Sequence, residues 1–225
     1  MASFPLVVFD LDGTLADTAP DLIATLNVIL GREGLPPVPV EGANELIGAG
    51  ARALVERGFE AGQRELAPAK SDALYRDFLA HYAENLCNES RLFPGVVEAL
   101  DTLAAQGFRF AVCTNKIEAH SRRLLDALGV STRFAAICGR DTFAYFKPDP
   151  RHLTLTIEQA GGDPARSIMV GDSITDIATA KAAAIPVVGV TFGYTDRPVR
   201  ELEPDVAIDA YEELPGAVAA IASRW

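Results

Sequence analysis

Two carboxylates, Asp10 and Asp12, lie two residues apart near the start of the chain, within the segment FDLDGTL at 9–15. The apolar run 6–9 precedes them, and a short β-branched run that ends before a glycine is typical of a buried strand. Side chains two apart in a strand point to the same face, so both carboxylates are expected together at the strand's carboxyl end. Two close negative charges are costly without a cation or a shared proton. The pair therefore indicates a divalent-metal site, acid–base chemistry, or both.

Alternating strands and helices follow in the second half of the chain. Two of the expected helices end at Gly107 and Gly129, and each is followed by an apolar run of strand length. Strands are expected at 108–113, 134–138, 167–171, 186–190 and 205–208, and helices at 96–106, 117–128, 150–160, 174–184 and the C-terminus. Short loops between alternating elements predict an α/β fold, a parallel, doubly wound sheet with a Rossmann-like core.

The segment 16–90 does not follow this alternation of strands and helices, because no strand is expected in it. Its apolar residues recur at helical spacing, which predicts helices at 21–30, 41–48, 51–61 and 68–86. An all-helical block inserted after the first strand does not fit into a parallel sheet. We therefore predict a core domain of residues 1–15 and 91–225 with an inserted α-helical cap domain of residues 16–90.

Polar side chains follow the expected strands at their carboxyl ends, where open α/β sheets bind ligands. Beyond the first pair, these residues are Thr114, Asn115, Lys147, Asp172, Ser173 and Asp176. Single members have simpler explanations: Thr114 could cap the next helix, and Lys147 could be a solvated loop charge. Asp172 and Asp176 could be an N-cap and a first-turn acid, both of which are favourable with the helix dipole. Their common position at one edge of the sheet favours a functional site over these separate explanations.

Composition narrows the class of partner. The 225 residues carry a net charge of −11, which argues against nucleic acid and against anionic membranes. Neither a signal peptide nor a membrane-spanning run is visible in the sequence. The three cysteines and three histidines show no spacing typical of a zinc site or a disulfide framework. We expect a cytoplasmic enzyme with a small-molecule substrate, either a monomer or a homodimer.

Together these motifs resemble those of the haloacid dehalogenase-like hydrolase superfamily, and the resemblance covers essentially the whole chain. The four matching motifs are DLDGTL at 10–15, Thr114-Asn115, Lys147-Pro148, and Gly171-Asp172 with Asp176. Within the superfamily, the segments 16–22 and 48–52 are similar to phosphoglycolate phosphatases. The resemblance implies a phosphatase with a Rossmann-like core and a helical cap.

The resemblance also implies roles for the two aspartates of the first motif. Asp10 would be the nucleophile that forms an aspartyl-phosphate, which divides one difficult hydrolysis into two easier steps. Asp12 would protonate the leaving alkoxide and then deprotonate the attacking water. Mg²⁺ would be held by Asp10, the backbone carbonyl of Asp12, and Asp172.

The remaining motif residues would support the metal and the phosphate. Asp176 and Ser173 are implied to orient metal ligands or waters from behind. Lys147 would offset phosphate charge, while Thr114 and Asn115 would bind phosphate oxygens.

Several reactions of the superfamily stay open at this point. Dehalogenases and phosphonoacetaldehyde hydrolases lack the second aspartate, so Asp12 argues for phosphate esters. A β-phosphoglucomutase-like mutase keeps both aspartates, although Gly13-Thr14 favours a phosphatase because many mutases carry Val after the glycine. An inorganic pyrophosphatase of the same cap type is a further alternative. A non-catalytic binding protein would be free to lose these acids and Lys147, and none is missing.

The cap is expected to select the substrate. With the cap closed, the turn from Gly48 to Gly50 would face the catalytic aspartates. Arg52 is the predicted contact for a substrate carboxylate, with Arg57 as a second candidate, and a solvated helix face is the alternative for both. These residues favour a small carboxylated phosphomonoester, and 2-phosphoglycolate is the substrate that the resemblance suggests.

Overall fold

A six-stranded parallel sheet forms the centre of the molecule in the computed structural model, which describes residues 4–40, 46–47, 50–195 and 197–225. Its strands are β1 (Phe4–Phe9), β4 (Arg109–Cys113), β5 (Phe134–Cys138), β6 (Gly162–Gly171), β7 (Val187–Val190) and β8 (Val206–Ile208). Their order in the sheet is β5-β4-β1-β6-β7-β8, and all neighbours pair in parallel. The chain builds one half of the sheet outward from β1 and then the other half. The carboxyl end of β1 is therefore the switch point at which open α/β sheets bind ligands.

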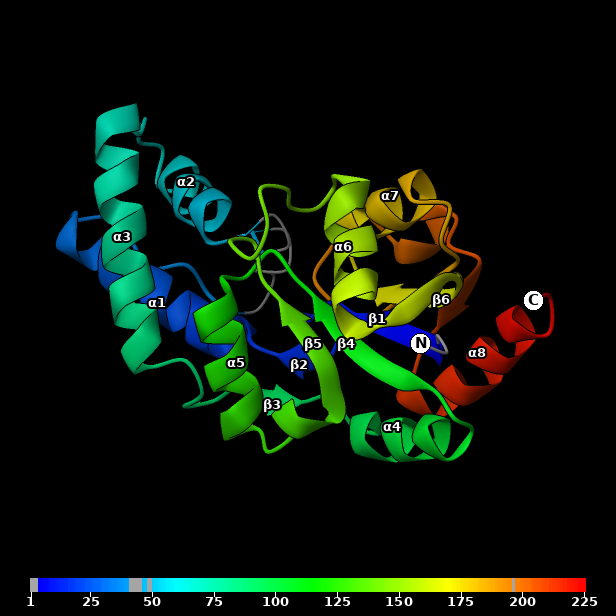
Figure 1. The fold of residues 1–225 in the computed structure, drawn as a ribbon. Helices are drawn as coiled ribbons and strands as arrows, with labels where there is room; N and C mark the ends of the chain where they lie inside the picture. The colour runs from blue at the N-terminus through cyan, green and yellow to red at the C-terminus, as the bar shows by residue number, and fades with distance from the viewer. Residues whose placement is uncertain (1–3, 41–45, 48–49, 196) are drawn as a thin grey trace.

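Helices cover both faces of this sheet (Figure 1). Because side chains alternate along β1, Val7 and Phe9 pack into one apolar cluster, whereas Leu6 and Val8 pack into the other. The first cluster includes residues of α4 (Val96–Ala105), α5 (Glu118–Ala127) and α8 (Leu214–Ala222). The second includes residues of α6 (Pro150–Ala160) and α7 (Ile174–Ala182). This arrangement confirms the predicted doubly wound α/β core.

Three helices stand to one side of the sheet, between β1 and β4 in the sequence (Figure 1). They are α1 (Ala19–Arg32), α2 (Ala51–Ala61) and α3 (Pro68–Glu84). They pack on one another through apolar faces, and a side chain at Gly58 of α2 would collide with Leu26 of α1, 2.8 Å from its nearest atom. Such close packing of three helices agrees with the predicted inserted α-helical block. The division at residues 15/16 and 90/91 stays a prediction.

A second, two-stranded sheet joins the two chain segments that lead into and out of these helices. Strand β2 (Ala16–Asp17) pairs antiparallel with β3 (Arg91–Leu92), with Ala16 opposite Leu92 and Asp17 opposite Arg91. The expectation of no strand in 16–90 was therefore wrong at its first two residues. A two-residue strand is too short to show an alternating pattern in the sequence.

Other boundaries differ little from those expected. Strand β6 begins at Gly162, five residues earlier than the predicted 167. Most of the helix expected at 41–48 lies outside the described residues, and Leu46 and Ile47 lie in a turn and a bend. Short 3-10 helices occupy Ser131–Arg133, Val199–Leu202 and Tyr211–Glu213.

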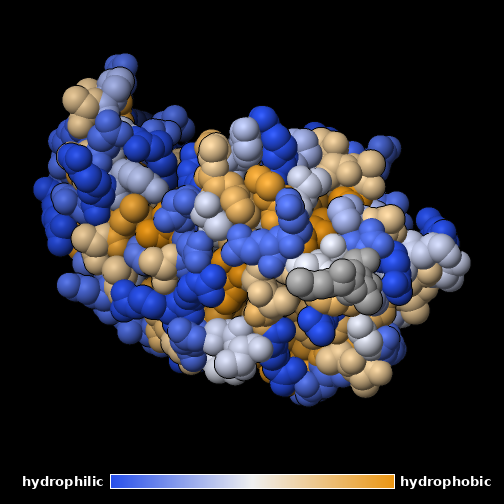
Figure 2. All heavy atoms as spheres, viewed as in Figure 1, coloured by the Kyte–Doolittle hydropathy of each residue, from blue (hydrophilic) through white to orange (hydrophobic). Residues whose placement is uncertain are grey.

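The surface is mixed in character. Hydrophilic residues cover much of the face drawn in Figure 2, and hydrophobic residues show between them in separate patches. Within the described ranges, no helix is both long and apolar enough to cross a bilayer. All three cysteines are free thiols.

Candidate active site

Asp10 lies at the carboxyl end of β1, at the bottom of a cleft, and is 9% exposed. Its Oδ1 is 2.8 Å from the Nζ of Lys147. Burial raises the pKa of Asp10 to about 6, and the charge of Lys147 only partly opposes this effect. A buried, electron-rich carboxylate beside a cation is suited to attack a phosphate group.

Three acids meet at this point. Asp10, Asp172 and Asp176 each offer a carboxylate oxygen, and these oxygens lie within 4.8 Å of one another. Burial raises the pKa of Asp172 well above its usual range, and the nearby charges of Asp176 and Asp10 raise it further. Crowded, buried carboxylates of this kind are stabilised by a divalent cation with a preference for oxygen ligands, so the donor set fits Mg²⁺.

The backbone around Asp172 leaves room only for glycine. Gly13 has a φ of +82°, and a Cβ there would lie 2.5 Å from Asp172 Oδ2. A Cβ at Gly193 would lie 2.2 Å from the Cβ of Asp172. The carboxylate of Asp172 is held by the Thr14 hydroxyl, at 2.6 Å, and by the backbone N–H of Tyr194, also at 2.6 Å. Neither donor was predicted from the sequence.

Lys147 is 2% exposed, so the alternative of a solvated loop charge was wrong. Its ammonium also donates to Asp176 Oδ1, at 2.5 Å. Burial opposes its charged form, but Asp10 and Asp176 outweigh that effect and raise the pKa of Lys147. Asp176 in turn accepts from the hydroxyl of Ser173, which is the N-cap of α7. The helix-end alternative was therefore wrong in making Asp172 the N-cap, whereas Asp176 does lie in the first turn of this helix. Ser173 thus holds Asp176, and Asp176 holds Lys147.

Thr114 and Asn115 follow β4, which pairs with β1, the strand that precedes the two aspartates. Thr114 is 1% exposed, and its hydroxyl accepts from the backbone N–H of Lys116 at 3.2 Å. The N-cap of α5 is Ile117, so the alternative that Thr114 caps this helix was wrong. The Asn115 amide donates to the carbonyl of Lys147 at 3.0 Å and so joins two of the motifs.

Asp12 is held by two donors that come from different parts of the chain. Its Oδ1 accepts from the hydroxyl of Thr18 at 2.7 Å and from Lys116 Nζ at 2.8 Å, and its Oδ2 is 3.1 Å from the same Nζ. The Lys116 side chain is 5% exposed. Lys116 was not among the predicted site residues, although it directly follows Thr114-Asn115 at the same strand end.

These residues face the helical block across a cavity of about 330 Å³. The wall from the core includes Asp10, Asp12, Thr114, Asn115, Lys116, His120, Arg140 and Lys147, and the wall from the helical block includes Leu22, Ile47, Gly50, Arg52, Tyr75, Phe78 and Tyr82. A Cβ at Gly50 would lie 3.8 Å from the carbonyl oxygen of Asn115, so the start of α2 comes close to the core loop. Gly48 lies outside the described residues.

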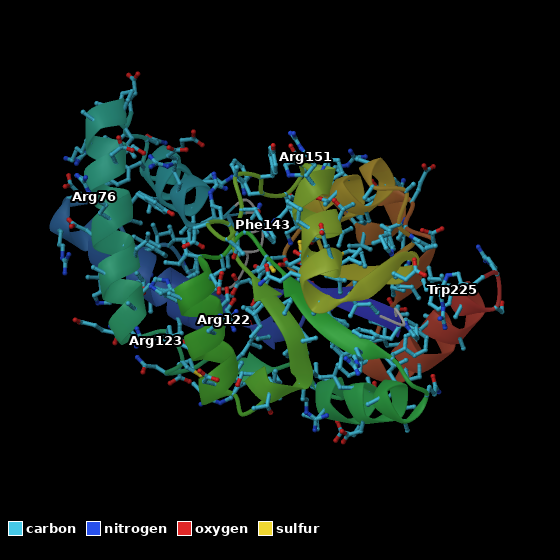
Figure 3. All side chains as sticks on the ribbon, in the orientation of Figure 1. Arg76, Arg122, Arg123, Phe143, Arg151 and Trp225 are labelled. Atoms are coloured by element: carbon cyan, nitrogen blue, oxygen red, sulfur yellow. The ribbon has the colours of Figure 1, made fainter. Side chains whose placement is uncertain are left out.

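The two arginines considered for substrate binding already have partners. Arg52 lines the cavity with its side chain 43% exposed, pairs with Asp72 at 2.7 Å and lies over the Tyr75 ring at 4.7 Å. Arg57 lies 3.5 Å from the carbonyl oxygen of Ile47. Three further arginines labelled in Figure 3, Arg76 on α3 and Arg122 and Arg123 on α5, are exposed and do not line the cavity.

Comparison with known proteins agrees with this geometry. A phosphoglycolate phosphatase of Mesorhizobium japonicum is 54% identical over 94% of this chain and 93% of its own length. One of Agrobacterium fabrum is 52% identical over 95% of this chain and 92% of its own. The crystal structure of a protein from Haemophilus somnus described as a predicted phosphoglycolate phosphatase is 35% identical, covers 96% of this chain and 99% of that one, and superposes with a TM-score of 0.87.

The family model of haloacid dehalogenase-like hydrolases matches residues 7–190, which include every motif residue of the acidic cluster and its lysine. The resemblance inferred from the motifs is thereby confirmed. The chain belongs to the haloacid dehalogenase-like hydrolases.

Proposed function

We propose that this protein is a Mg²⁺-dependent phosphatase that hydrolyses 2-phosphoglycolate through an aspartyl-phosphate. The observation that carries the proposal is the buried Asp10 carboxylate, 2.8 Å from Lys147 and within one cluster of acids, at the wall of a cavity. The relatives at 54% and 52% identity, both named phosphoglycolate phosphatase, support the choice of substrate.

The first step is attack of Asp10 on phosphorus. Lys147, held between Asp10 and Asp176, offsets negative charge as the phosphoryl group is transferred, and the Thr114 hydroxyl donates to a phosphate oxygen. Mg²⁺ held by Asp10, Asp172 and the Asp12 backbone carbonyl would neutralise the charge of the phosphate and so permit the approach of an anion.

Asp12 moves the protons. In its acid form Asp12 protonates the leaving alkoxide oxygen in the first step, and the carboxylate so formed takes a proton from the attacking water in the second. One residue serves both steps because the first leaves it in the base form that the second requires. The contacts from Thr18 and Lys116 hold this carboxylate at the cavity wall beside Asp10.

The cavity favours a small substrate. A volume of about 330 Å³ is at the lower end of ligand pockets, and several aromatic and aliphatic side chains of the helical block line it. A two-carbon phosphomonoester fits such a space, and closure by these side chains excludes water that would weaken the electrostatic contacts. The cytoplasmic location and the state as a monomer or homodimer stay predictions.

Release of inorganic phosphate in the presence of Mg²⁺ tests the proposal. The panel holds 2-phosphoglycolate, β-glucose 1-phosphate, pyrophosphate and p-nitrophenyl phosphate, and we expect the highest kcat/KM on 2-phosphoglycolate. Asp10→Asn should abolish release, whereas Asp126→Asn, an exposed acid on α5, should not change it. Conversion of β-glucose 1-phosphate to the 6-phosphate would show a mutase instead. Preference for pyrophosphate would show a pyrophosphatase, and no turnover of any substrate would indicate a binding protein.

A further inference from the structure

One side of the cavity carries a cation and a hydroxyl that the proposed mechanism does not use for the phosphate. Lys116, from the loop after β4, and Tyr82, from α3, are 9% and 1% exposed and both line the cavity. The Nζ of Lys116 is 4.5 Å from the centroid of the Tyr82 ring. The sheet domain and the helical block therefore each contribute one polar group to the same corner.

The Tyr82 hydroxyl is buried and makes no hydrogen bond of ordinary geometry among the described residues, and the charged neighbour that partly opposes the effect of burial on its pKa is the Lys116 ammonium. A buried hydroxyl without a partner costs free energy, so its persistence at a cavity wall needs an explanation. Burial raises the pKa of Tyr82 to about 12, so the hydroxyl keeps its proton at neutral pH and can donate it to an acceptor. Its ring stacks on Phe78, with centroids 6.0 Å apart, which fixes the position of the hydroxyl.

Lys116 keeps its charge in this corner. Burial disfavours the ammonium, but the Asp12 carboxylate outweighs burial and raises the pKa of Lys116. An ammonium has three donors, and the carboxylate that Lys116 contacts is Asp12, whose oxygens lie 2.8 and 3.1 Å from Nζ. The nearby ring of His120 is neutral at neutral pH, since burial and the charge of Lys116 lower its pKa to about 4.

Other cations at the cavity wall are held elsewhere. Lys147 is bound by Asp10 and Asp176, and Arg52 by Asp72. The guanidinium of Arg140 lies over the Phe146 ring, 3.6 Å from its centroid. Lys116 is the cation that is bound to the acid–base residue itself.

We propose that Lys116 and the Tyr82 hydroxyl form the subsite for the carboxylate of the substrate. This inference rests on the proposed function. Asp12 must come within about 3 Å of the leaving oxygen to protonate it, and Lys116 is in contact with Asp12. Standard bond lengths place a carboxylate on the neighbouring carbon about 3 Å from that oxygen. A carboxylate one carbon from the phosphoester oxygen therefore reaches Lys116 while the phosphate is at Asp10.

The subsite would explain selection for a short acid. The substrate carboxylate supplies an acceptor to Tyr82 and a second anionic partner to Lys116, whereas a neutral ester leaves the hydroxyl without a partner. A site built to pair with a group rejects analogues that lack it, because its own polar atoms stay unpaired. This assignment differs from the sequence-based prediction, which gave the carboxylate to Arg52.

The test compares 2-phosphoglycolate with 2-hydroxyethyl phosphate, which replaces the carboxylate by a neutral hydroxymethyl group. The quantity is the ratio of kcat/KM for the acid to kcat/KM for the alcohol, which cancels any loss that affects both substrates. Lys116→Met should lower the ratio roughly ten- to a hundredfold, the range for a lost charge-assisted hydrogen bond. Tyr82→Phe keeps the ring and should lower the ratio at least about threefold. Lys181→Met, on α7 and bonded to the Leu202 carbonyl, is the matched control and should not change it.

Three results would overturn the subsite. Equal losses on both substrates in Lys116→Met and Tyr82→Phe would mean that these residues only position Asp12 and the cap. A drop of the ratio in Arg52→Ala alone would return the carboxylate to Arg52. The third result is a binding measurement that compares Asp10→Asn with the double variant that also carries Lys116→Met. Calorimetry should show that the double variant binds 2-phosphoglycolate more weakly, and equal affinities would contradict the subsite. If the wild-type protein releases no phosphate from either ester, the proposed function fails, and the calorimetry still decides the subsite.

Discussion

The burial of Asp10 makes the metal-free protein pH-sensitive in an unusual direction. Its pKa is raised from 3.8 to about 6 by burial, so the folded state holds the proton more tightly than the unfolded state does. The contribution of Asp10 to the free energy of unfolding is therefore fully present below about pH 4 and is lost as the pH rises through the pKa of the folded state. The difference of about 2 in pKa corresponds to about 3 kcal/mol of unfolding free energy at neutral pH.

Asp10→Asn removes this cost because an amide does not ionise. In EDTA, the Tm of Asp10→Asn minus that of the wild type should therefore increase between pH 4 and pH 8. For a chain of this size, about 3 kcal/mol corresponds to roughly 6–12 °C. Lys147 keeps its contact with Asp176 in the variant. The amide also removes the repulsion by which Asp10 raises the pKa of Asp172, and this effect acts in the same direction.

Thermal melting at half-unit pH steps, with and without Mg²⁺, measures the effect. Asp126→Asn is the control and should follow the wild type at every pH. Mg²⁺ should raise the wild-type Tm more at pH 7.5 than at pH 5, because metal ligands must be deprotonated to bind. A Tm difference between Asp10→Asn and wild type that is the same at pH 4 and pH 8 would refute the reasoning, since it would show that the Asp10 charge costs the fold nothing.

Three further predictions concern the same site. Asp12→Ala should accumulate a hydroxylamine-sensitive phosphoenzyme with p-nitrophenyl phosphate, because this substrate leaves without an acid while hydrolysis still needs the base; absence of trapped label would contradict an Asp12-dependent second step. Mg²⁺ should activate and Ca²⁺ should inhibit, because Ca²⁺ accepts up to about eight oxygens and can hold both oxygens of Asp10; equal rates with the two ions would exclude this explanation. Gly13→Ala should weaken Mg²⁺ binding by calorimetry and lower the Tm, because its Cβ would lie 2.5 Å from Asp172 Oδ2 at a φ of +82°; unchanged affinity would show that Asp172 can move without loss.

The strands of the large sheet were predictable because buried parallel strands are short apolar runs between glycine-rich turns. The two short strands beside Ala16 and Leu92 were not, since their pairing joins residues 75 or so positions apart and leaves no local pattern. The motif residues at the strand ends were predictable for a related reason. Parallel strands bring their carboxyl ends to one edge of the sheet, so polar residues that directly follow the strands can be assigned to that edge from the sequence alone.

What the sequence could not predict depends on contacts between distant segments. Lys116 and Asp12 are 104 positions apart, and only the fold shows that one binds the other. Tyr194 acts on Asp172 through its backbone N–H, which carries no residue-specific signal. The sequence does not reveal that the Tyr82 hydroxyl is unpartnered, because a tyrosine on an amphipathic helix commonly extends its hydroxyl to water. Only the structure shows that this hydroxyl is buried.

The ladder between β2 and β3 has a consequence for how the chain could be rebuilt. Asp17 and Arg91 are directly opposite each other in an antiparallel pair, so the whole helical excursion begins and ends at neighbouring points. A hairpin turn of two to four residues could join them and leave the large sheet unbroken. In such a chain the catalytic half would be a continuous module open to solvent, and a different insert could be grafted at the same two residues. Substrate selection and phosphoryl chemistry could then be exchanged independently, because both covalent connections between the two parts lie at a single pair of hydrogen-bonded strands.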